Sequence, residues 1–153
     1  GIALVGHNGA GKSTMLSLTA GLTNATTGLV EVAGSVAPLL ELGSGFHPDL
    51  TGEENIRINA ALMGMSRRDL NRKYDSILEF SGLGDFIREP LRTYSSGMIM
   101  RLGFSVAISM EPDVLVADEI LGVGDRAFFD QCLKRMLEFR EQGKTIVFAS
   151  HSP

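Results

Sequence analysis

Little in this sequence points to a secreted, membrane-spanning or duplex-binding protein. The 153 residues include one cysteine, Cys132, so an internal disulfide cannot form, which fits a reducing compartment. There is no uninterrupted apolar run of about 18 residues and no charged-then-apolar leader, so we expect neither a membrane span nor a signal peptide. Positive charge is not in excess, because 14 Lys and Arg against 18 Asp and Glu give a net charge of −4. That balance argues against generic binding of nucleic acid.

The remaining composition is that of one globular domain. Hydrophobic residues make up 44% of the chain and charged residues 21%, which allows a sizeable core and excludes a disordered chain. The length also fits a single domain. The chain begins at Gly1 without an initiator Met and enters an apolar, strand-like run at once. We therefore expect some upstream sequence to be missing.

A phosphate-binding pattern follows this first strand. Residues 6–13 read Gly-His-Asn-Gly-Ala-Gly-Lys-Ser and satisfy G-x-x-x-x-G-K-[ST], between the apolar run 2–5 and a predicted helix at 13–20. In this pattern backbone N–H groups form an anion nest, Lys12 reaches the β- and γ-phosphates, Ser13 is a ligand of Mg²⁺, and Thr14 extends the cradle. The sequence thus predicts a nucleoside triphosphate site. Its predicted residues are Gly6, Asn8, Gly9, Ala10, Gly11, Lys12, Ser13 and Thr14.

The segment between the motifs predicts a small β hairpin and a helical insert. Residues 29–32 alternate as a strand before a turn into Ser35-Val36. Thr51 and Glu54 have the spacing of a capping box that opens a helix with Ile56, Ala60 and Ala61 facing inward. Ser66 and Asp69 repeat that spacing, and the second helix should stop at Gly82. We assign residues 51–97 to this helical subdomain.

The second half adds acidic and imidazole side chains at the ends of two predicted strands. The apolar strand 114–117 ends in Asp118-Glu119, where Asp118 is placed to hold Mg²⁺ and Glu119 to orient or deprotonate a water that attacks the γ-phosphate. The strand 145–149 leads to Ser150 and His151. Because parallel strands end at one edge, we expect His151 to sense the γ-phosphate there.

A second anion site is indicated at residues 94–98, Tyr-Ser-Ser-Gly-Met, which precede another helical run. The loop at 6–13 already accounts for the phosphates of its own nucleotide. The second site is therefore redundant or serves a nucleotide held by a neighbouring molecule, and read alone it is a simple Ser N-cap.

Taken in order, these motifs resemble the ATP-binding cassette of ABC transporters over nearly the whole chain. Residues 6–13 stand at the Walker A motif, residues 94–98 at the LSGGQ signature and residues 114–119 at the Walker B motif. Asp125 falls at the D-loop aspartate and His151 at the switch histidine. The resemblance implies an α/β P-loop NTPase fold with a mainly parallel core sheet, a small β hairpin and the helical subdomain. It also implies that 1–153 is a single domain, truncated at both ends.

The same resemblance implies an ATPase that uses ATP and Mg²⁺ and pairs head to tail as a homodimer. Ser95, Gly97 and Asp125 would then act on the nucleotide of the other copy. The cassette would lie peripherally on the cytoplasmic side of the inner or plasma membrane, bound to an integral membrane permease that handles the cargo.

Several departures from the usual motifs indicate a subclass. Ser96 and Met98 replace the glycine and glutamine of the signature, Ile120 replaces a proline, and Glu41 is the polar residue nearest to the missing Q-loop glutamine. Glu41 would reach Mg²⁺ or its water, at the cost of more negative charge beside Asp118. Taken together, the chain looks like the branch that exports polysaccharides, such as O-antigen, capsule and teichoic acid, in the segments 39–48, 51–52, 54–56, 94–98 and 122–125.

Two other functions are left open by the sequence. The first is a non-transport mechanical ATPase of the same fold, of the ribosome-associated or chromosome-maintenance type. The sequence shows no sustained heptads between Lys12 and Ser95, and its acidic balance speaks against an RNA-facing role. The second is a nucleotide-binding module without turnover.

Overall fold

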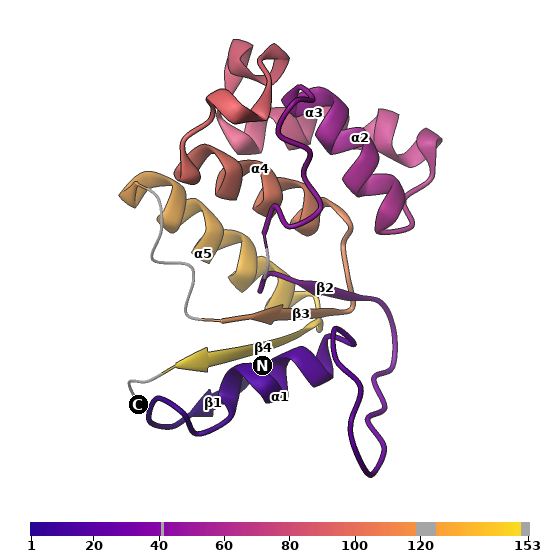
Figure 1. Ribbon diagram of the computed structural model, residues 1–153, viewed down its shortest axis with the longest axis vertical. Helices are drawn as coiled ribbons and strands as arrows, with labels where there is room; N and C mark the ends of the chain where they lie inside the picture. Colours follow the sequence, from indigo (N-terminus) through magenta and orange to yellow (C-terminus); the bar gives the residue numbers. More distant parts are fainter. Residues whose placement is uncertain (41, 119–124, 151–153) are drawn as a thin grey trace. The chain divides into compact units, whose positions relative to one another are not determined.

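A four-stranded, all-parallel sheet forms the centre of the first of two compact units in the chain (Figure 1). The computed structural model describes residues 1–40, 42–118 and 125–150. The first unit comprises Gly1–Leu40, Pro112–Gly122 and Arg126–Pro153, and the second comprises Glu41–Glu111 and Val123–Asp125. Each unit has its own hydrophobic core, so each is described separately.

The sheet has the strand order β1-β4-β3-β2. Its strands are β1 (Ile2–Val5), β2 (Val36–Pro38), β3 (Val114–Ala117) and β4 (Thr145–Ser150). The β3 strand is buried along its whole length, as an apolar strand inside a parallel sheet must be. Because all four strands run in one direction, the residues that follow β1 and β3 leave the same edge of the sheet.

Helices α1 (Lys12–Thr19) and α5 (Arg126–Glu141) cover opposite faces of this sheet. Leu16 of α1 packs in a core cluster with Val116 and Val147. The alternate residues point the other way. Ile146 is one of them, and it lines a hollow together with Met136 of α5. Cys132 of α5 is also buried.

The second unit is helical. It contains α2 (Gly52–Leu62), α3 (Arg67–Ser81), the short 3-10 helices Gly84–Arg88 and Leu91–Thr93, and α4 (Ser96–Ser109). Residues from all three α-helices meet in one core, with Ile56 and Ile77 fully buried at its centre. None of the helices in the described ranges is long and apolar enough to cross a membrane.

The helix caps of this unit follow the sequence signals, with one difference at α3, and one residue of α2 faces the other way. Thr51 and Glu54 form the predicted capping box, and Gly82 ends α3 with a φ of 62°. At the start of α3 only half of the box is present, since the Asp69 carboxylate accepts from the Ser66 hydroxyl. The prediction that Ala61 faces inward is wrong, because it lies one residue beyond Ala60 and the helix turns it into solvent.

The predicted hairpin is not formed. Residues 29–32 have no strand pairing, and the side chain of Leu29 is 80% exposed. The reason lies in Ser35, whose carbonyl accepts from Asp113 and Val114 and whose N–H donates to the Asp113 carboxylate. These bonds direct the chain into β2 beside β3, so the backbone after the turn is not available to residues 29–32.

Candidate functional site

The glycine-rich loop connects β1 to α1, as the sequence predicts. Gly9 and Gly11 have φ values of 84° and 89°, a backbone region that residues with a Cβ rarely adopt. Gly11 is the N-cap of α1, and no side chain caps the helix there. The first N–H groups of α1 therefore have no intrahelical or capping partner and are available to an anion.

Lys12 lies across this loop. Its ammonium donates to the carbonyl oxygens of Gly6, at 2.7 Å, and His7, at 3.0 Å. These bonds hold the charged end of Lys12 above the loop and beside the first turn of α1. The positive charge and the uncapped helix start thus act on the same space.

A side-chain contact joins the loop to the residue that follows β3. The Ser13 hydroxyl donates to Oδ2 of Asp118, at 3.0 Å, although 105 residues separate the two in sequence. A hydroxyl and a carboxylate are the hard oxygen ligands that Mg²⁺ accepts, and this ion is bound in proteins by one or two carboxylates plus substrate phosphates. The pair therefore fits a magnesium ion at the edge of the phosphate cradle.

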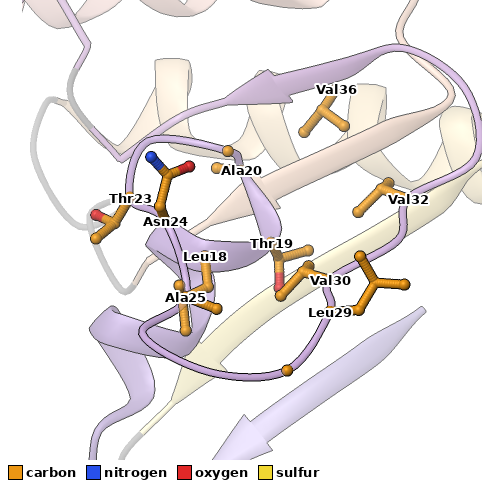
Figure 2. A pocket seen from close by; sticks show the side chains of 12 residues that line it. Leu18, Thr19, Ala20, Thr23, Asn24, Ala25, Leu29, Val30, Val32 and Val36 are labelled. Carbon is orange, nitrogen blue, oxygen red and sulfur yellow. The ribbon is translucent and has the colours of Figure 1, made fainter.

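These groups line one hollow of about 580 Å³, formed by Asn8, Gly9, Gly11, Lys12, Ser13, Thr14 and Asp118. Another hollow of the first unit, of about 440 Å³, lies between the end of α1 and residues 21–36 (Figure 2). Aliphatic side chains, among them Leu29, Val30 and Val32, line it together with the polar side chains of Thr19, Thr23 and Asn24, and none of the lining residues is charged. Only the first of these two hollows combines a cation, backbone donors and a carboxylate, as a metal-bound phosphate requires.

The second predicted anion site lies in the helical unit. Ser95 is the N-cap of α4, and its hydroxyl oxygen accepts from the N–H of Met98, at 3.2 Å. The N-cap interpretation of Ser95 is thus correct as local structure. Ser95 and Ser96 are exposed, and among the described residues a Cβ at Gly97 would meet only the Ser95 hydroxyl, at 3.8 Å. The start of α4 is therefore open to an incoming ligand.

Tyr94 fixes the residues just before α4. Its hydroxyl donates to the carbonyl of Phe86, and a Cβ at Gly52 would lie 2.4 Å from the same hydroxyl. Burial raises the pKa of Tyr94 to about 12, so the phenol is neutral at physiological pH. The start of α2 and the segment before Ser95 are thereby packed together.

An ion pair between Arg101 and Asp125 was not predicted from the sequence. Arg101 lies on α4, and its guanidinium contacts the Asp125 carboxylate within the helical unit. The two residues are 24 positions apart and Asp125 lies outside α4, so no helical or strand periodicity in the sequence relates them. The sequence signal that singled out Asp125 was its place at the D-loop position of the ATP-binding cassette.

Three predicted site residues, Glu41, Glu119 and His151, lie outside the described residues. The described ones fall into two groups. Lys12, Ser13 and Asp118 come together in the first unit with the glycine-rich loop, whereas Ser95, Gly97 and Asp125 belong to the second unit.

A parallel α/β sheet whose first loop cradles an anion beside a strand-end aspartate defines the P-loop class of nucleotide-binding proteins. The family model described as ABC transporter matches residues 1–122, and the chain belongs to this family.

Several curated relatives of this chain are named as ATP-binding proteins of export systems. The O-antigen export system ATP-binding protein RfbB of Klebsiella pneumoniae is 54% identical over 99% of this chain and 61% of its own length. The protein of that name from Myxococcus xanthus is 50% identical over 98% of this chain and 34% of its own. The teichoic acids export ATP-binding protein TagH of Enterococcus faecalis is 48% identical over 99% and 34%. This chain therefore spans 61% or less of the length of these relatives.

Solved structures confirm the fold. A structure described as the ATP-binding subunit of an ABC transporter superposes with a TM-score of 0.84 at 26% identity, over 99% of this chain and 68% of that one. A dimeric ATP-binding cassette bound to ADP and Pi gives a TM-score of 0.80 at 21% identity, over 99% and 74%. The predicted α/β fold with a parallel core sheet is thus confirmed, apart from the hairpin.

Proposed function

We propose that this chain is the ATP-binding and ATP-hydrolysing part of an ABC transporter that exports a cell-surface polysaccharide of the O-antigen, capsule or teichoic acid type. The observation that carries the proposal is the contact between the Ser13 hydroxyl and the Asp118 carboxylate, at 3.0 Å. It joins the glycine-rich loop to the carboxylate at the end of β3 in one hollow. The relatives named for O-antigen and teichoic acid export support the choice of cargo.

The loop residues bind and orient the triphosphate. Backbone N–H groups from Gly6 to Thr14 donate to the α- and β-phosphates, and Lys12 places its charge at the β- and γ-phosphates. The carbonyl oxygens of Gly6 and His7 already hold that ammonium above the loop, so little side-chain entropy is lost when the phosphates bind.

Ser13 and Asp118 would hold Mg²⁺, with Glu41 as a further oxygen ligand in place of the usual glutamine. When bound, this ion neutralises charge that develops on the phosphate oxygens. Glu119 orients the attacking water and accepts its proton. His151 contacts the γ-phosphate.

Two copies pair head to tail, with Ser95 and Gly97 of one facing the γ-phosphate held by the other. The exposed hydroxyl of Ser95 and the open space around Gly97 favour this arrangement, because nothing within the described part of the same chain covers them. Binding of ATP then favours the closed pair and hydrolysis releases it, which an attached membrane permease converts into movement of the glycan. The cassette itself lies peripherally on the cytoplasmic side of the membrane.

The experiment is complementation of a strain that lacks this gene. Wild-type protein should restore the surface polysaccharide and co-purify with a membrane permease, whereas Glu119→Gln should co-purify but not restore the polymer. Restoration by Glu119→Gln would contradict the role of hydrolysis. Co-purification with ribosomes in place of a permease would favour the mechanical ATPase over the exporter.

A further inference from the structure

Arg101 lies in the second turn of α4, the helix that begins after Ser95, and contacts Asp125, the residue at the D-loop position. The guanidinium of Arg101 contacts the Asp125 carboxylate with its Nη2. The Arg101 side chain is 25% exposed and that of Asp125 is 51% exposed, so the pair is partly shielded from water. Such a pair is stronger than one between fully solvated side chains.

The other terminal nitrogen of the same guanidinium, Nη1, lies beside Gly82. A Cβ at Gly82 would lie 3.1 Å from Nη1 of Arg101, so the arginine passes directly over the glycine that ends α3. The carboxyl end of a helix carries partial negative charge, which favours a cation there. Arg101 therefore connects the end of α3, the second turn of α4 and the residue before α5.

The division of the chain agrees with this role. Asp125 belongs to the helical unit with α4, although Arg126, the next residue, belongs to the unit with the sheet. Arg101, its ion-pair partner, lies in the same unit. Ser95, Gly97 and Asp125 are thus parts of one compact unit.

We propose that Arg101 is a positioning residue that makes the signature segment and Asp125 move as one body when they approach the nucleotide of a second copy. This inference rests on the proposed function, in which Ser95, Gly97 and Asp125 all act on the other copy. The charge of Arg101 also offsets the Asp125 carboxylate, which otherwise repels the triphosphate that it approaches. Arg101 does not itself touch the nucleotide.

The test is steady-state ATP hydrolysis by the whole chain with Arg101→Gln, Asp125→Asn and the double variant. Arg101→Gln should lower kcat about tenfold or more and leave KM for ATP within about twofold, because the loop that binds ATP in the same copy is untouched. The double variant should be no slower than Arg101→Gln, since the arginine acts through this carboxylate. Arg101→Lys should recover part of kcat, because it restores the charge without the forked geometry.

Arg72→Gln is the matched control, because Arg72 forms an ion pair with Asp69 on the exposed face of α3 and should keep wild-type kcat. If the melting curve shows that Arg101→Gln does not fold, Asp125→Asn removes the same ion pair by changing Asp125, the more exposed of the two side chains. Additive losses in the double variant, or an undiminished kcat in folded Arg101→Gln, would overturn the inference. A wild-type chain without ATP turnover would instead overturn the proposed function itself.

Discussion

At the scale of single residues, the site depends on where a few charges are held. Lys12 is fixed above the loop by the carbonyl oxygens of Gly6 and His7, and Ser13 is fixed to Asp118. The position of Lys12 and Ser13 at the start of α1 was predictable from the sequence because the pattern at 6–13 is local. The Arg101–Asp125 pair was not predictable, since no local rule connects two side chains from different elements.

Replacing Lys12 with Ala should weaken ATP binding about tenfold or more. The variant loses the one charged side chain that the described loop places beside the phosphates, and charge-assisted hydrogen bonds are the strong ones. Calorimetric titration with ATP measures the effect. Lys134→Ala, on the exposed side of α5, is the control and should bind as the wild type does. Equal affinity of Lys12→Ala and wild type would contradict the role of Lys12.

At the scale of elements, caps and strands could be predicted wherever the signal lies inside one segment. The capping box at Thr51 and Glu54 and the strand at 114–117 are examples. The hairpin failed because alternation in residues 29–32 describes a half-buried strand but does not choose its partner. That choice was made by Asp113, whose bonds to Ser35 fix the start of β2.

The turn before β2 gives a sharp test of this account. Gly34 has a φ of 96°, and a Cβ there would lie 2.5 Å from the Asp113 carboxylate. Gly28 has a similar φ of 87°, but a Cβ there would meet nothing within 4 Å. Gly34→Ala should therefore lower the free energy of unfolding by about 1 to 3 kcal/mol more than Gly28→Ala does, as measured in urea. Equal losses in the two variants would show that Asp113 does not fix this turn.

At the scale of the whole molecule, stability should fall in acid. Backbone and side-chain hydrogen bonds from Ser35 hold the pKa of Asp113 below its ordinary value, and bonds from Thr51 do the same for Glu54. A carboxylate with a lowered pKa in the folded state stabilises the fold above its unfolded pKa, and this contribution is lost as the pH falls through the folded value. The loss should therefore set in below about pH 4.5.

Urea unfolding at about pH 7 and about pH 3 measures this loss. Asp113→Asn should reduce the difference between the two pH values, because the variant has no proton to gain at this position. Asp130→Asn, an exposed position on α5, is the control and should keep the wild-type difference. If Asp113→Asn retains the full pH dependence, the Ser35 bonds do not stabilise the ionised carboxylate.

The central claim is that this chain hydrolyses ATP with Glu119 as the residue that accepts the proton from water. The most direct measurement is phosphate release by the purified protein, wild type against Glu119→Gln, with ATP binding measured in parallel. The account predicts that Glu119→Gln binds ATP as the wild type does and turns it over at least about a hundredfold more slowly. Undiminished turnover by Glu119→Gln would contradict it.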